Sequence, residues 1–247
     1  MVAEEIRGIE DSSRILLPRR YGKRERFEKD CLKEPPMRED QLVTYRTNRN
    51  NGFRVDYDYH YRQSRHNTNW ANPVADIGNK INFLNQFRCH IPYAIADNLQ
   101  PVLEDVSPLF TKVQGVEIQD LNERGVIYPV FREIFDRLRG SVKRFGETAT
   151  SKFMHMTLPN LFAMADSVVG SYMQRNNIIN HYFVVSEDYV RLLRYYFTEI
   201  NELVEDIMKN HELNRLEAIN RIREKDPYAE GSIPRIIDKH FYWLGTH

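Results

Sequence analysis

Three side chains capable of proton transfer or nucleophilic attack lie close together in the stretch KFMHMTLPNLFAMAD, residues 152–166. They are the amine of Lys152, the imidazole of His155 and the carboxylate of Asp166. Lys152 and His155 stand at positions i and i+3, so on a helix they would share one face. Pro159 predicts a break in that helix, because proline cannot continue the hydrogen bonding of a helix interior.

Each of these residues also has a structural interpretation. An aspartate at the start of a helix accepts hydrogen bonds from free backbone N–H groups and suits the helix dipole, and Asp166 fits this pattern. A single histidine between two methionines, as His155 is, is more often a hydrogen-bonded core residue than a ligand. The stretch is therefore either a catalytic corner or two core helices with a capped joint.

Helices that would position this stretch are predicted by apolar residues at helical spacing over most of the chain. Pro101 marks a kink or a boundary in one of them. The expected helical segments are 76–90, 93–106, 129–145, 147–158, 166–176, 186–209, 212–224 and 233–243. The predicted fold class is mainly α. We expect a multi-helix globular domain over residues 73–247, with a small N-terminal β-hairpin and a charged N-terminal arm.

The N-terminal part of the chain differs in composition from the rest. Residues 1–40 are rich in charge, and we interpret them as an extended arm, because few apolar groups offset the entropy of ordering them. Residues 41–72 are an expected hairpin or extended segment. Within them FRVDYDYHYR, residues 53–62, alternates with period two, as a strand does. Its partner strand would be residues 42–47, across the turn residues NRNNG.

An alternative interpretation of the same segment is a nucleic-acid-binding surface. Its tyrosines would stack with bases, and its arginines would contact the sugar-phosphate backbone. The residues concerned are Tyr57, Tyr59, Arg46, Arg49, Arg54, Arg62 and Arg65. The tyrosine face thus packs against a core in the first interpretation and against nucleic acid in the second.

Composition argues against several classes of function. The 247 residues include 35 Lys and Arg against 35 Asp and Glu, so bulk charge does not drive binding to nucleic acid or anionic membrane. Cys31 and Cys89 have no zinc-binding spacing, and no phosphate-binding glycine loop occurs. We expect no metal and no cofactor. Without an apolar span or the features of a signal peptide, we expect a cytoplasmic protein with no membrane partner.

The stretch 147–175 resembles a pattern found in a loose set of uncharacterised helical proteins. The pattern is Lys, two residues, His, three residues, Pro, Asn or Asp, Leu-Phe, three residues and Asp. The C-terminal IPRIIDKHFYWLG is similar to the closing helix of the same set. The pattern is in turn distantly similar to the active-site corner of the helix-hairpin-helix DNA glycosylases, where a lysine and a helix-starting aspartate face the extruded nucleotide.

The resemblance implies roles for individual residues. Lys152 would attack C1′ of the sugar as a neutral amine, with a pKa lowered by burial. Asp166 would stabilise the positive charge that develops as the base leaves. Aromatic side chains would hold the extruded base, and the candidates are Tyr172, Tyr195, Tyr196 and Trp243. The chain departs from the superfamily in lacking its glycine-bearing hairpin, of which only Gly146 remains.

Two classes of function follow. The first is a helical nucleic-acid-binding protein of DNA glycosylase-like architecture, with DNA or RNA as its partner, and with or without catalysis. The second is a structural or interaction protein without catalytic activity, whose N-terminal arm mediates self-association or binds a protein partner. The surroundings of Asp166 separate them, because the first requires an open cavity shared with Lys152 and the second a packed wall.

Overall fold

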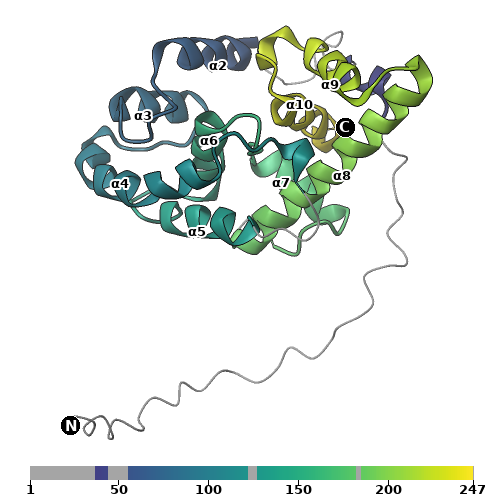
Figure 1. Cartoon of the computed structure of the whole chain (residues 1–247). Helices are drawn as coiled ribbons and strands as arrows, with labels where there is room; N and C mark the ends of the chain where they lie inside the picture. Colours follow the sequence, from purple (N-terminus) through teal and green to yellow (C-terminus); the bar gives the residue numbers. More distant parts are fainter. Residues whose placement is uncertain (1–36, 44–54, 122–126, 182–184, 247) are drawn as a thin grey trace, which may run out of the picture. The chain divides into compact units, whose positions relative to one another are not determined.

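The chain is mainly helical in the computed structural model, which describes residues 37–43, 55–121, 127–181 and 185–246 (Figure 1). These residues all belong to one compact unit, Leu32–His247. Across the described residues there are nine α-helices and no strand, which confirms the expected mainly α class. The helices are α2 (Val55–Asn67), α3 (Ile77–Gln86), α4 (Ala96–Lys112), α5 (Tyr128–Leu138), α6 (Glu147–Thr157), α7 (Ser167–Arg175), α8 (Ser186–His211), α9 (Arg215–Glu224) and α10 (Ile233–Thr246).

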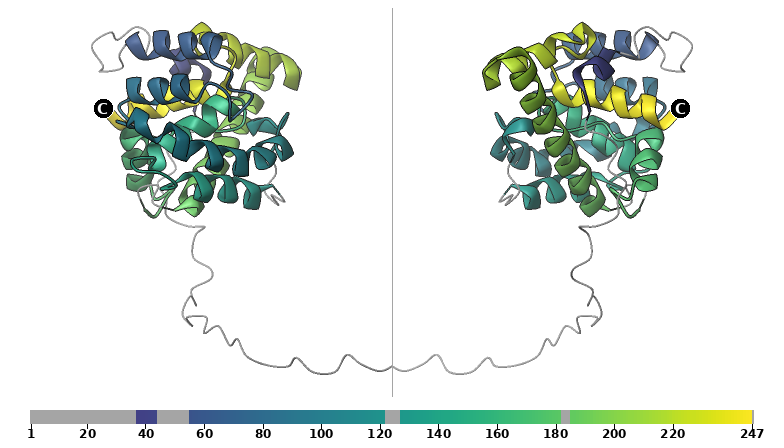
Figure 2. Two further views of the ribbon diagram at one scale, coloured as in Figure 1. Left: turned by 90° about the vertical axis from the view of Figure 1, so that its left-hand side faces the viewer. Right: turned by 90° about the vertical axis from the view of Figure 1, so that its right-hand side faces the viewer.

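Helices α6 and α10 form the buried centre of this unit. Every residue of α6 from Ala149 to Thr157 is buried, and so is every residue of α10 from Ile233 to Phe241. Helix α7 packs on α10. Among the outer helices, α5 packs on both α4 and α8, and α9 packs on α8. In both views of Figure 2, α10 (yellow) runs between neighbouring helices. A helix buried on all sides marks the core, because a surface helix keeps one polar face in water.

The long helix α8 carries the apolar stripe that its sequence predicts. Tyr189, Leu193, Tyr196 and Ile200 recur at helical spacing, and all four are fully buried. The ring of Tyr189 stacks on Phe135 of α5, with centroids 4.8 Å apart. Burying one such large side chain stabilises a fold by about 1.5–3 kcal/mol. The packing of α5 on α8 therefore anchors the middle of the chain.

The structure shows a helix, α2, where a strand was expected at residues 53–62. Tyr57 and Tyr61 stand four residues apart, so the alternating pattern also satisfies one face of a helix. Tyr61 is fully buried on that face, whereas Tyr59 is 61% exposed. The expected partner strand, 42–47, lies mostly outside the described residues. A period of two over so few residues did not distinguish a strand from a helix.

Helix α5 is shorter than the expected segment 129–145. It ends at Leu138, because Arg139 is extended and Gly140 adopts a left-handed backbone conformation with φ of 70°. The backbone N–H of Gly140 donates to the Phe145 carbonyl at 2.7 Å, which closes the turn. Phe145 is nevertheless fully buried. Its apolar side chain therefore indicated a buried position correctly, but it did not indicate a helical conformation.

Helix α4 is longer than expected and contains two prolines. It continues through Pro101 and Pro108, although each proline lacks the N–H group that a helix interior uses. Its inward face carries Leu99, Leu103 and Val106, each at most 1% exposed. The apolar packing of this face outweighs the missing backbone hydrogen bonds, so Pro101 marks no boundary.

The end of the expected arm packs on the helical unit. The short 3-10 helix η1 (Glu39–Val43) is held there by Met37 and Leu42, which are 4% and 1% exposed. Burial raises the pKa of the Glu39 carboxyl group, but hydrogen bonds from three side chains outweigh burial and lower it to about 2. These side chains are Lys225, Arg221 and His211. Residues 1–36 of the expected arm lie outside the described residues.

Candidate functional site

A cavity of about 420 Å³ lies where α6 and α10 meet the start of α7. Lys152 and Asp166 both line it, so the amine and the carboxylate singled out in the sequence face the same space. Further walls come from α2, the end of α3 and the turn before α6. Cavities that bind small ligands have volumes of roughly 300–1,000 Å³, so this one can hold a ligand of nucleotide size.

The amine of Lys152 is deeply buried, with 6% of the residue exposed. Its Nζ donates to the Phe87 carbonyl at 3.1 Å and lies 5.2 Å from the centre of that ring. Burial lowers the pKa of Lys152, while the nearby Cys89 and Asp166 act in the opposite direction. A desolvated lysine of this kind has an increased fraction of neutral, nucleophilic amine.

Asp166 is both a helix cap and part of the cavity wall. Its Oδ1 accepts hydrogen bonds from the backbone N–H groups of Val168 and Val169, at 2.9 Å and 3.0 Å. No described residue donates a hydrogen bond to its Oδ2. The structural and functional interpretations of this residue are therefore compatible. One carboxylate oxygen holds the start of α7, and the other remains available to a ligand.

Ser151 joins α6 directly to the segment that precedes α7. Its Oγ donates to the Ala165 carbonyl at 2.9 Å and accepts from the Ala165 N–H at 3.0 Å. Ser151 is the residue before Lys152, and Ala165 is the residue before Asp166. This reciprocal pair of hydrogen bonds therefore fixes the two functional groups relative to each other.

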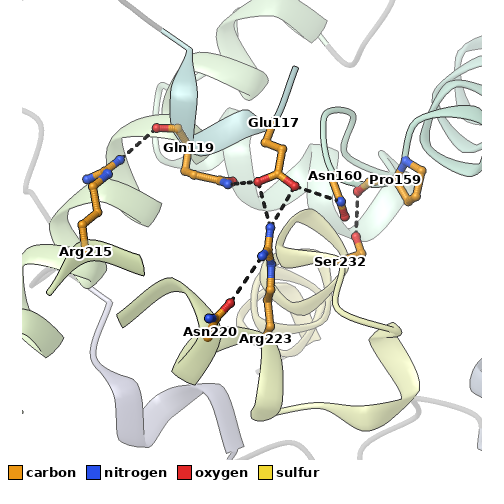
Figure 3. A network of polar contacts seen from close by, with 8 residues as sticks. All are labelled: Glu117, Gln119, Pro159, Asn160, Arg215, Asn220, Arg223 and Ser232. Atoms are coloured by element: carbon orange, nitrogen blue, oxygen red, sulfur yellow. Dashed lines mark hydrogen bonds and ion pairs between the residues drawn. The ribbon is translucent and has the colours of Figure 1, made fainter. Parts of the chain in front are cut away.

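A polar network outside the cavity fastens the turn at Pro159 (Figure 3). Glu117 lies at its centre, where both carboxylate oxygens accept from Arg223 at 2.8 Å and one accepts from the Asn160 side chain at 3.1 Å. Ser232, just before α10, donates to the Pro159 carbonyl at 2.7 Å. The chain reversal between α6 and α7 is thus held by residues distant in sequence.

Helix α10 contributes two cavity residues that the sequence analysis missed. Arg235 and Asp238 line the cavity, although they are only 5% and 3% exposed. Asp238 accepts from the Met164 N–H through Oδ2 and from the Tyr196 hydroxyl through Oδ1, both at 2.9 Å. The signal that could have found them is a pair of charges at i and i+3 within the apolar run IPRIIDKHF. Charges on a buried face require partners or a function.

Two arginines and three aromatic rings also line the cavity. Arg88 and Arg144 are exposed, and their backbones are left-handed, with φ of 62° and 69°. Such strain in residues other than glycine is concentrated at functional sites. Neither guanidinium group forms an ion pair with another described residue, which leaves both available to an anion. The rings of Tyr57 and Phe87 stack with centroids 5.0 Å apart, and Tyr242 completes the aromatic part of the wall.

His155 lies in the core and does not line the cavity. Its Nδ1 is 2.6 Å from the Phe162 carbonyl oxygen, and its Nε2 is 3.1 Å from the Tyr61 hydroxyl. Burial lowers the pKa of its imidazole to about 3. Both ring nitrogens are occupied, as expected of a core histidine.

The aromatic residues expected to hold a base lie elsewhere. Tyr172 is buried and stacks on Phe241 of α10, with centroids 5.6 Å apart, and Tyr195 and Tyr196 contact the same ring. Neither these three tyrosines nor Trp243 line the cavity. The rings that do line it come from α2, the end of α3 and α10, because helix rotation and not residue type decides which side chains face a cavity.

Four of the residues proposed as a nucleic-acid-binding surface lie on α2, and their surroundings differ. Tyr57 lines the cavity, whereas Tyr59 points to solvent. Arg62 forms an ion pair at 3.5 Å with a glutamate near α10, and Arg65 donates to a backbone carbonyl of α6 at 2.8 Å. The residues outside the described part of the chain are Arg46, Arg49 and Arg54.

Comparison with known proteins found no match: no family model fits the chain, and no curated protein or solved structure is significantly similar to it. Function is therefore inferred from the geometry of the cavity. Within the described ranges, no cluster of three or more His, Cys, Asp or Glu side chains could hold a metal ion. Among the same residues, no helix has the length and apolar character needed to cross a membrane.

Proposed function

We propose that the chain is a nucleic-acid-binding protein whose cavity holds one extruded nucleotide, and that Lys152 and Asp166 cleave its N-glycosidic bond. One observation carries the proposal: an amine and a carboxylate from successive helices line the same cavity. The resemblance of this corner to the helix-hairpin-helix glycosylases supports the same chemistry. In that case the reaction would release a base and leave a sugar without its base.

Other features of the cavity support a nucleotide as its ligand. The stacked rings of Tyr57 and Phe87 offer an aromatic surface, and aromatic side chains hold unpaired bases by stacking. Arg88 and Arg144 offer planar guanidinium groups, which bind phosphate oxygens in pairs. An aromatic wall and two guanidinium groups that form no ion pair with a described residue suit the base and the phosphate of one nucleotide, although Arg144 also donates to the His90 carbonyl at 3.4 Å.

The proposed step begins with a neutral Lys152. Nζ forms a bond to C1′ while the bond from C1′ to the base breaks, and its electron pair leaves with the base, which takes up a proton. Asp166 stabilises the positive charge at C1′ through its available Oδ2. Loss of a proton from Nζ and opening of the sugar ring give an imine. Water then hydrolyses the imine and regenerates the lysine.

Borohydride trapping tests this proposal directly. The protein is incubated with oligonucleotides that contain uracil, hypoxanthine or an abasic site, as DNA and as RNA, together with sodium borohydride. Hydride addition to the imine carbon gives a stable amine, and mass spectrometry should locate the adduct on Lys152. Lys152→Met should abolish it. Lys80 provides an internal control, because burial lowers its pKa to about 8 although it does not line the cavity.

The outcomes separate the two classes of function. An adduct on Lys80, or no adduct with any oligonucleotide, would remove the catalytic proposal. Binding that weakens steeply with salt would then leave a nucleic-acid-binding protein without catalysis. Absence of binding would favour the alternative, an interaction protein that associates through residues 1–40.

A further inference from the structure

We propose that Asp238 donates the proton that the departing base takes up, an inference that rests on the proposed function. Asp238 lines the same cavity as Lys152 and Asp166, but it is contributed by α10, far along the chain. Three carboxyl groups line the cavity, those of Glu147, Asp166 and Asp238, and Glu147 forms an ion pair with Arg139 at 4.0 Å. The other two, Asp166 and Asp238, have different surroundings. Such a division is typical of sites where one carboxyl group acts as an acid and the other stabilises positive charge.

The surroundings of the two carboxyl groups differ in burial and in hydrogen bonding. Asp166 is half-buried at the start of α7, where its side chain accepts hydrogen bonds from the backbone N–H groups of Val168 and Val169. Asp238 is 3% exposed. Its two oxygens accept from the Met164 N–H and the Tyr196 hydroxyl. The Met164 N–H can only donate, so a proton carried by Asp238 has as its acceptor either the Tyr196 hydroxyl oxygen or a group bound in the cavity.

Burial raises the pKa of Asp238 to about 7, so this carboxyl group retains its proton into the neutral range. Arg235 on the same helix, the Met164 N–H and the Tyr196 hydroxyl of α8 act in the opposite direction, while the charge of Asp166 raises the pKa further. Lys152 of α6 and Tyr189 of α8 also interact electrostatically with Asp238. A general acid with a pKa near the working pH is the most effective kind.

Asp238 adds one proton transfer to the cleavage of the N-glycosidic bond. As the bond between C1′ and the base breaks, the base nitrogen receives the electron pair of that bond, and a base atom takes the proton of Asp238. The charge of Arg235 favours the resulting Asp238 carboxylate, which regains a proton from water after the base leaves. No oxidant, metal or second substrate is needed.

The test compares two leaving groups with the variant Asp238→Asn. Oligonucleotides carry guanine or 7-methylguanine at one position. The cationic 7-methylguanine nucleotide releases a neutral base without being protonated. For guanine, Asp238→Asn should lower the rate about 100-fold or more. For 7-methylguanine the rate should change less than about 3-fold, because acid catalysis contributes little when no proton is needed.

Each outcome decides between the two proposals. Wild-type protein that releases neither base and gives no borohydride adduct contradicts the proposed function and, with it, this inference. An adduct on Lys152 without release of guanine keeps the proposed function and overturns the role of Asp238. Wild-type protein that releases only 7-methylguanine, or equal losses for both bases in Asp238→Asn, overturns the role of Asp238 alone. Far-ultraviolet circular dichroism and thermal unfolding show whether the variant is folded.

Tyr196→Phe provides a second variant that retains the acid. Guanine release by the wild type should decrease as pH rises through about 7, because the protonated form of Asp238 disappears. The Tyr196 hydrogen bond lowers the pKa of Asp238, so its removal should move this decrease to higher pH. A purely structural role of Asp238 would leave the position of the decrease unchanged, which would contradict the inference.

Discussion

Two buried lysines of this protein, Lys239 and Lys152, have opposite surroundings. Lys239 on α10 lies between two carboxylates, with Nζ 2.6 Å from Asp226 and 2.6 Å from Asp58. Lys152 on α6 has a backbone carbonyl as its hydrogen-bond partner and faces a cavity. Burial lowers the pKa of both amines, but among the described residues only Lys239 has carboxylates in direct contact. Lys239 therefore neutralises neighbouring carboxylates, whereas the amine of Lys152 is available for reaction.

The largest expected effect is on stability and distinguishes the two lysines. Lys239→Met leaves the carboxylates of Asp58 and Asp226 without their shared cation, and breaking a buried pair in this way costs about 3–5 kcal/mol. Lys152→Met leaves no described carboxylate without its ion pair, but it removes the hydrogen bond to the Phe87 carbonyl, so the loss in free energy of unfolding should be smaller, about 1–3 kcal/mol. Urea unfolding of both variants measures the difference. Equal losses would show that Lys152 is a structural charge as well.

A smaller effect is expected at Asp166, where one substitution should lower activity without lowering stability. Asparagine caps a helix about as well as aspartate does, so Asp166→Asn should keep the fold while losing the negative charge. Base release should decrease about 100-fold, the magnitude expected when electrostatic stabilisation of the transition state is removed. Asp166→Ala should lose the same activity and about 1 kcal/mol of stability, because the cap is removed. Full activity in Asp166→Asn would assign the residue to capping alone.

The smallest effect is expected in the network that fastens the turn at Pro159. Glu117→Gln weakens the two hydrogen bonds from Arg223, and the half-exposed network should lose about 1 kcal/mol of stability. Base release should decrease several-fold, because the angle between α6 and α7 is less firmly held. Glu133→Gln is the matched control, since Glu133 pairs with an arginine on an exposed helix face. If both variants behave alike, the turn does not depend on Glu117.

Local sequence signals predicted the corner itself. Helix α6 ends at Thr157 and α7 begins after Asp166, close to the boundaries expected from Pro159 and the capping aspartate. Capping and proline effects depend on residues within one helical turn, so they can be recognised without knowledge of the fold. The apolar stripe of α8 was predictable for the same reason.

The predictions from the sequence were wrong where the conformation depends on contacts between residues distant in the chain. The tyrosines at residues 57–61 alternate like a strand, but α2 forms because Tyr61 packs in a core that includes His155 of α6. Tyr172 and Trp243 were assigned to the cavity by residue type alone. Their actual orientation depends on how α7 and α10 rotate against each other, which local spacing does not determine.

The sequence by itself determined a helical chain with a sharp reversal at Pro159 and a capped helix start at Asp166, because these follow from hydrogen bonding and steric effects within a few residues. Only the tertiary structure decided that the reversal opens into a cavity and that α10 adds Arg235 and Asp238 to it. It also decided that Lys152 is buried with no carboxylate of the described residues in contact, whereas Lys239 is paired. These outcomes depend on long-range packing, which places groups from distant segments in one environment of low polarity and thereby sets their charge.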